Sequence, residues 1–221
     1  MHSAGMTALL GLLLLAPQDE ALKLRWKIAS TDFVRYKCWR LEINNGGDQK
    51  TEDVNRHAGL FGYEIAEHRV YHPKELDWWE IPLILGYSLP EKAIKVGQTL
   101  KYDFPLNQGY DYEDLVALCT VERIAYDTGV RLKLDAKLRS RKNQIHWPQF
   151  QIGESTVEAL VDFDPERGVV TRLEYTLSIN FLPREAGQKI DSRKRRDLLE
   201  LVEVLAPRHE HFEKEVNAAI D

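Results

Sequence analysis

The sequence lacks the short motifs by which many enzymes are recognised. It has no Gly-x-Ser-x-Gly elbow, no Walker loop, no Gly-x-Gly-x-x-Gly fingerprint and no His-Glu-x-x-His zinc motif. The seven histidines are scattered, and His68 and His72, four residues apart, do not lie in a helical pattern. We therefore predict no catalytic residue, no metal site and no obligatory cofactor.

Cysteine is scarce as well. Only Cys38 and Cys119 occur, and neither belongs to a Cys-x-x-Cys pair, which removes the common zinc and thioredoxin-type interpretations. In an exported protein a disulfide between them would close a loop of roughly 80 residues and stabilise the fold by ~4 kcal/mol. The alternative is two buried thiols that pack as small hydrophobic side chains. The sequence leaves both hypotheses open.

Long apolar runs are nearly absent. The one candidate, Thr7 to Ala16, has the length of a signal-peptide core and falls short of the ~20 residues that cross a bilayer. No Lys or Arg precedes it, and a buried or frayed N-terminal helix is the alternative. We predict that residues 1–16, or up to about 20, are a signal peptide. The protein is then exported, periplasmic or extracellular, without a membrane span.

An excess of positive charge is also missing. Lys and Arg total 30 against 35 Asp and Glu, a net charge of -5. Nucleic-acid binding requires a basic surface, so this balance argues against it. The one basic cluster, Arg193 to Arg196, precedes a helical pattern and is more typical of a solvated helix face.

The clearest positive feature is a β-hairpin from Thr156 to Phe181. Apolar and polar residues alternate along both arms, as in strands with one buried and one exposed face, and Thr171 is the one mild exception. The connection from Asp164 to Gly168 has turn chemistry, because Pro165 presets φ and Gly168 tolerates positive φ. This hairpin predicts an antiparallel β scaffold.

Further strands extend this scaffold into a β domain over residues 21–183. Alternating patterns predict strands over 22–28, 33–43, 99–104, 115–126 and 130–138, and a weaker one over 59–71. The apolar parity shifts near Cys38, which predicts a β-bulge there. Pro82 and Gly86 predict a loop or edge segment over Trp78 to Leu89. The residues predicted to be buried are Trp26, Tyr36, Val121, Leu132, Leu134, Val161, Phe163, Leu173, Tyr175, Leu177 and Ile179.

The pattern changes period after Pro183. Leu198, Leu201, Val202 and Leu205 recur at helical spacing behind a capping Asp191 or Ser192. A second short helix is predicted after Pro207. The predicted fold is therefore mainly β, an antiparallel curved sheet, half-barrel or sandwich, with one or two C-terminal α-helices over 190–221 packed on it.

Three segments of the chain resemble a loosely defined group of exported, uncharacterised bacterial proteins. The segments are the mature start PQDEALKLRWKI, the connector LPEKAIKVGQTLKYDF and the hairpin VEALVDFDPERGVVTRLEYTLSI. Leu100 stands where the group usually has Trp, and Ser30-Thr31-Asp32 replaces a Lys-Gly-Asp turn. The resemblance implies export and an all-β core, and it carries no catalytic residues.

Aromatic residues in loop-like segments are the candidate ligand-binding residues. Exposed aromatic rings can stack on sugars or fill a partner's pocket, and the alternative is that these rings form a lid on the core. The carboxylates Asp103, Asp111, Glu113 and Asp114 lack the spacing of a known calcium loop and predict a solvated loop. The predicted ligand-binding residues are Trp78, Trp79, Tyr87, Tyr110 and Tyr112.

The sequence leaves three functional hypotheses. The leading one is a non-enzymatic envelope or secreted binding protein whose curved sheet accepts an apolar or amphipathic ligand, or a partner's segment, under the helices. The second is a carbohydrate-binding module that uses Trp78, Trp79 and the Tyr110/Tyr112 loop. The third is a hydrolase whose groups converge only in space.

Overall fold

The structure is a computed structural model, and it describes residues 20–28, 33–44, 48–49, 56–59, 64–65, 70–71, 81–106, 115–140, 150–183 and 191–205. Within these residues the fold is mainly β, with one short helix. The elements in chain order are β1 (Phe33–Asn44), β2 (Asp48–Gln49), β3 (Arg56–Gly59), β4 (Glu64–Ile65), β5 (Val70–Tyr71), α1 (Ile81–Tyr87), β6 (Thr99–Pro105), β7 (Leu115–Ile124), β8 (Val130–Ser140), β9 (Phe150–Ile152), β10 (Ser155–Asp164), β11 (Val169–Pro183) and β12 (Asp191–Leu205).

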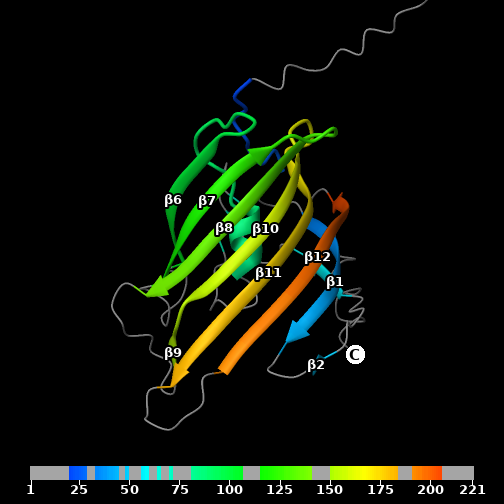
Figure 1. Cartoon of the computed structure of the whole chain (residues 1–221). Helices are drawn as coiled ribbons and strands as arrows, with labels where there is room; N and C mark the ends of the chain where they lie inside the picture. Colours follow the sequence, from blue (N-terminus) through cyan, green and yellow to red (C-terminus); the bar gives the residue numbers. More distant parts are fainter. Residues whose placement is uncertain are drawn as a thin grey trace, which may run out of the picture.

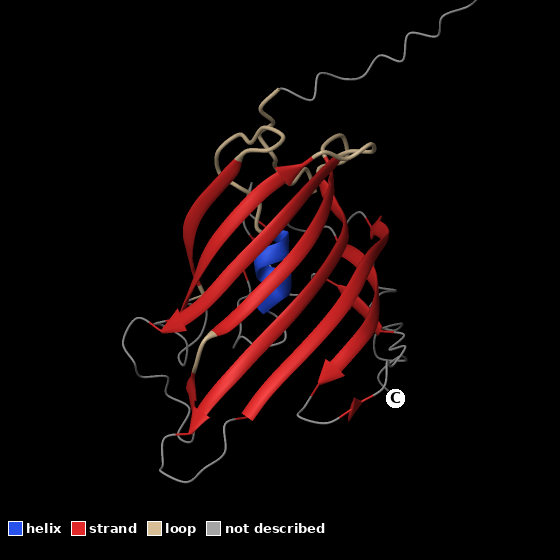
Figure 2. Cartoon of the chain, in the orientation of Figure 1, coloured by secondary structure: helices blue, strands red, loops and turns tan. Residues whose placement is uncertain are grey.

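One open antiparallel sheet dominates the molecule. Its main path runs β2-β1-β12-β11-β10-β8-β7-β6, while β3 also pairs with β1 and β9 with β11. Figure 1 shows that this sheet curves strongly and that β6 and β1 lie on opposite sides of it. Figure 2 shows α1 in the hollow of the curve, where it contacts β10 and β11. The predicted antiparallel curved sheet is confirmed.

The core lies between the inner face of the sheet and α1. Every residue that the sequence predicted to be buried is buried, from Trp26 in the N-terminal segment to Ile179 on β11. The inner row across five strands, Val121, Leu134, Ala159, Tyr175 and Asp197, shows how register aligns these side chains. Period-2 alternation therefore identified the inner face of the central strands correctly.

The predicted hairpin is β10 and β11, and its one irregular residue has a structural reason. The register shifts at Asp162/Phe163, so that Phe163 faces Val170 while Asp162 still faces Arg172. Thr171 is left as the extra residue of a β-bulge, and its hydroxyl donates to the carbonyl of Asp162 at 3.2 Å. Gly168 closes the turn at φ 63°, as the sequence predicted.

Two predictions about the strand segments need smaller corrections. Residues 22–28 do not form a strand: Leu22 makes an isolated bridge with Ile94, and the Lys27 N–H donates to the carbonyl of Gly168 at 3.0 Å. In β1 the register shifts between Arg35 and Tyr36 and between Arg40 and Glu42, on either side of Cys38 rather than at it. The second shift skips Leu41 on β1, and this extra residue explains why the apolar parity slips along the strand.

The predicted loop or edge segment from Trp78 to Leu89 is wrong where the structure describes it. Residues 81–87 form α1. Pro82 is tolerated because it lies in the first turn, where the N–H has no intrahelical partner. Gly86 allows close packing, since a Cβ there would lie 2.5 Å from Cδ1 of Leu173. Because α1 is buried on most sides, it carries no amphipathic pattern to detect.

The predicted C-terminal helix over residues 191–205 is also wrong. This segment is β12, which pairs with β11 on one side and β1 on the other. Its inner face carries Arg195 and Asp197 before Leu199, so apolar residues do not alternate along it. The register with β1 also skips Val202, which is 48% exposed. The second helix predicted after Pro207 lies outside the described residues.

Candidate functional site

Within the described residues, β6 lies at one edge of the open sheet. Within the described residues β6 has one neighbour, β7, in a regular ladder from Thr99↔Glu122 to Pro105↔Val116. Pro105 cannot donate a backbone hydrogen bond, so proline is tolerated in a strand where its nitrogen faces away from the ladder. In an antiparallel strand alternate residues share this orientation, so the backbone N–H and C=O groups of Lys101 and Asp103 also point outward.

A groove runs along this edge. It has a volume of about 270 Å³ and lies between residues 88–92 on one wall and residues 100–104 on the other. Five consecutive residues of β6 line it, and alternate residues point to opposite faces, so the groove follows the strand's edge rather than one face. Leu100 and Tyr102 are half-buried, Phe104 is buried, and Lys101 and Asp103 are exposed.

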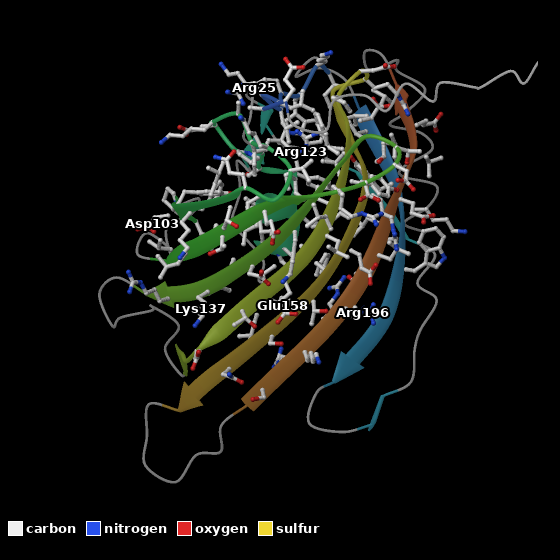
Figure 3. All side chains as sticks on the ribbon, turned by 45° about the horizontal axis from the view of Figure 1, so that its top comes forward. Arg25, Asp103, Arg123, Lys137, Glu158 and Arg196 are labelled. Atoms are coloured by element: carbon white, nitrogen blue, oxygen red, sulfur yellow. The ribbon has the colours of Figure 1, made fainter. Side chains whose placement is uncertain are left out.

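The opposite wall is held by Arg25. The Arg25 guanidinium donates to the carbonyls of Pro90 at 3.1 Å and Glu91 at 2.8 Å. Next to it, Leu22 and Ile94 exchange backbone hydrogen bonds of 3.1 and 2.9 Å. Figure 3 shows Arg25 near the upper end of the molecule and Asp103 at the β6 edge. The wall is therefore fixed to the N-terminal segment rather than left as an isolated loop.

Arg123 joins the same N-terminal segment to β7. Its guanidinium donates to the carbonyls of Glu20 at 2.9 Å and Ile94 at 3.1 Å, and its own backbone bonds to Gly97 and Gln98. Burial lowers the pKa of Arg123. Both ends of residues 94–98 are thus anchored, which positions the start of β6.

Tyr87 lies in the core, away from solvent. It is 1% exposed, its ring packs against Trp26 and Tyr36, and its carbonyl accepts the Trp26 indole N–H at 2.9 Å. The structure thus gives this predicted ligand-binding residue a packing role. Trp78, Trp79, Tyr110 and Tyr112 lie outside the described residues.

In the sequence, the groove residues 88–92 and 100–104 fall between Tyr87 and the Tyr110/Tyr112 loop. Ser88 follows Tyr87 directly, and Phe104 comes three residues before Asn107. Sequence reasoning missed the groove residues themselves, because Leu100 and Tyr102 have the alternation of any half-buried strand. The only sequence signal for an edge was Pro105 at the end of that strand.

A cluster of polar side chains lies on the inner face of the sheet, apart from the groove. The Tyr175 hydroxyl donates to Oδ2 of Asp197 at 2.8 Å, and Arg195 forms an ion pair with the same carboxylate. Asp197 is fully buried. Burial, followed by the nearby Asp197 charge, raises the pKa of Tyr175 well above its ordinary value. The Tyr175–Asp197 hydrogen bond therefore joins β11 to β12 inside the core.

Both cysteines are buried as free thiols. The sheet order places β12, β11, β10 and β8 between Cys38 on β1 and Cys119 on β7. Burial, together with the Asp103 carboxylate, raises the pKa of Cys119 to about 12. Since the thiolate is the reactive form, Cys119 is chemically inert at neutral pH.

Metal ligands do not cluster in the part of the chain that the structure describes, where no group of three or more His, Cys, Asp or Glu could hold an ion. Asp103 lies exposed on β6, whereas Asp111, Glu113 and Asp114 fall outside the described residues. In the same described part, α1 is the one helix, and its seven residues cannot span a membrane.

Comparison with known proteins gives no match: no protein-family model, curated protein or solved structure is significantly similar to this chain. The resemblance to exported bacterial proteins therefore stays a prediction.

Proposed function

We propose that this chain is an exported, non-enzymatic binding protein of the envelope or the extracellular space, and that it takes up an apolar or amphipathic ligand, or a partner's segment, in the groove beside β6. The observation that carries the proposal is the groove itself, where one wall is a sheet edge and the other is a segment clamped by Arg25. The predicted position under C-terminal helices is abandoned, because residues 191–205 form β12 within the sheet.

The composition of the groove supports an amphipathic occupant. Leu89, Pro90, Leu100 and Phe104 supply apolar surface, while Lys92, Lys101 and Asp103 supply charges at the rim. A volume of about 270 Å³ is at the small end of the range for ligand sites. The groove therefore suits one acyl or aromatic moiety, or a few residues of an extended chain, better than a large enclosed ligand.

The contacts of the N-terminal segment are compatible with export. Cleavage between Ala16 and Ala21 would keep Leu22, Leu24, Arg25 and Trp26, which contact the groove wall and the core. Mass spectrometry of the native protein is expected to find a new N-terminus in this interval. An intact Met1 on the native protein would contradict export.

Native mass spectrometry of freshly purified protein tests the binding function. A co-purified lipid or peptide is expected, and adding it back should raise the melting temperature, because a ligand that binds only the folded state stabilises it. The matched variants are Leu100→Ser in the groove and Leu160→Ser on the outer face of β10, both partly exposed. Leu100→Ser should weaken binding by about tenfold or more, and Leu160→Ser should not.

Three other outcomes would contradict the proposal. A co-purified glycan would favour the carbohydrate-binding hypothesis, and turnover on an ester, phosphate or glycoside panel would favour the hydrolase. Equal loss of binding in the Leu100→Ser and Leu160→Ser variants would place the site elsewhere.

A further inference from the structure

We infer that the β6 edge pairs with the β6 edge of a second copy of this chain, antiparallel and with Tyr102 on the two-fold axis, so that the two open sheets become one. This inference rests on the proposed function, because it uses the same groove. It identifies the partner segment as β6 of the second copy. Its basis is the order of residues along β6, which is complementary to itself in one register.

The backbone groups of β6 are oriented for such pairing. Within the described residues its outer side has no strand neighbour, and the position of Pro105 assigns the outward N–H and C=O groups to Lys101 and Asp103. In an antiparallel pair centred on Tyr102, Lys101 of one copy faces Asp103 of the other. These two residues then exchange both backbone hydrogen bonds, and the exchange occurs twice because of the symmetry.

The outer-face charges select this register. Lys101 and Asp103 are both exposed, and centring the pair on Tyr102 sets each Lys101 opposite an Asp103. Centring it on Lys101 or on Asp103 would set like charges opposite each other. Centring it on Leu100 or Phe104 would leave the two opposite charges unpaired.

The inner-face residues are complementary in the same register. Leu100 of one copy faces Phe104 of the other, and Tyr102 faces Tyr102 on the axis. Leu100 and Tyr102 are only half-buried in the single chain, although their counterparts on β7, Val121 and Cys119, are buried. A second copy would cover this apolar surface, and the groove beside residues 100–104 leaves room for its side chains.

Analytical ultracentrifugation over a concentration series tests the inference with charge exchanges. Wild type is expected to dimerise. Lys101→Asp and Asp103→Lys alone each create like-charged pairs, so each should weaken dimerisation by about tenfold or more. Mixing these two variants restores both opposite-charge pairs and should give a heterodimer. Lys137→Asp, a matched exchange on the outer face of an internal strand, should leave the dimer unchanged (Figure 3).

A cysteine crosslink tests the two-fold axis. Residues on the axis face themselves at a Cα separation of about 4.5 Å, which a disulfide can bridge, so Tyr102→Cys should crosslink two chains under oxidation. The variant is made with Cys119→Ala, because Cys119 lies opposite Tyr102 in the β6–β7 ladder. Leu100→Cys in the same background is the control, since its two copies would lie on the order of 13 Å apart.

Monomeric wild type at the highest soluble concentration would overturn the inference, as would a dimer that survives both charge variants. A monomer that still loses its ligand on Leu100→Ser would overturn the pairing and leave the binding function standing. A Tyr102→Cys variant that crosslinks no better than Leu100→Cys would show that Tyr102 is not on an axis.

Discussion

The hairpin of β10 and β11 and the edge strand β6 share the same alternation of apolar and polar residues, but they differ in how far their inner faces are buried. Both hairpin strands have a neighbour on each side, and their inner residues, such as Val161 and Leu177, are buried. β6 has β7 on one side within the described residues, and its inner residues Leu100 and Tyr102 are half-buried. The alternation determines which face is apolar, whereas the position in the sheet determines how completely that face is buried.

The largest effect is expected from a charge in the hairpin core. Leu173→Asp places a carboxylate opposite the buried Val161 and Leu199, where no side-chain surface is exposed, so it should prevent folding. Leu160→Asp, on the outer face of the same hairpin, is 37% exposed in wild type and should fold normally. Circular dichroism and thermal melts of the two variants measure this contrast. A folded Leu173→Asp protein would show that the inner face is assigned wrongly.

A smaller loss is expected from the polar cluster between β11 and β12. Asp197→Ala leaves the Arg195 guanidinium and the Tyr175 hydroxyl without their carboxylate inside the core, which should cost about 3–5 kcal/mol. Glu200→Ala, on the exposed face of the same strand, is the control and should cost less than about 0.5 kcal/mol. Urea unfolding compares the two. Similar losses would mean that the cluster does not hold the strands together.

High pH should weaken the fold through buried acids. The pKa of Cys119 is about 12 in the folded protein against an ordinary value of 9.0, so the unfolded state loses its proton first as pH rises. Its contribution to stability is present below pH 9 and is lost between about pH 9 and 12, at up to ~1.4 kcal/mol per pH unit. Tyr36 and Tyr175, whose pKa values are also raised, act in the same direction. Cys119→Ala should flatten the measured pH dependence, and an unchanged slope would contradict this assignment.

The smallest effects on the free energy of unfolding are expected from replacing two aspartates, Asp162 and Asp103. Asp162 on β10 is buried and binds Arg131 through both oxygens, at 2.5 and 2.7 Å, so Asp162→Ala should cost about 1.5–3 kcal/mol. Asp103 on β6 is exposed, and Asp103→Ala should change the free energy of unfolding by less than about 0.5 kcal/mol. Chemical denaturation at a low, fixed protein concentration keeps self-association out of the comparison. A larger loss for Asp103→Ala would make the edge a stabilising element.

The sequence predicted the parts of the fold whose inner faces are uniformly apolar. The β10–β11 hairpin with its turn at Gly168, the strands over 115–126 and 130–138, and all eleven core residues follow from alternation and turn chemistry. β12 was not predicted because its inner face carries the Arg195–Asp197 ion pair in place of apolar residues, and the Tyr175 hydroxyl that also binds Asp197 lies on another strand. α1 was not predicted from the sequence because a buried helix has no polar face. Gly86 also has a low helix propensity, although it allows close contact with Leu173.

The candidate site could be predicted from the sequence only in part. Local sequence showed which segments are irregular, but not that residues 88–92 lie across a groove from residues 100–104. That proximity depends on Arg25 and on the order of strands in the sheet, both of which are long-range properties. Whether a strand lies at an edge cannot be known until all of its neighbours are placed.

The N-terminal segment has a consequence for the order in which the protein matures. Trp26 bonds to a carbonyl 61 residues later, Arg25 to one 66 residues later, and Lys27 reaches Glu166 across 139 residues. A chain that emerges from its N-terminus therefore carries this segment undocked until the β10–β11 turn exists. Such sequence-distant contacts slow folding, because the loop entropy is lost before the contacts form. Residues 25–27 are thus among the last to form their native contacts, although most of the chain is synthesised after them.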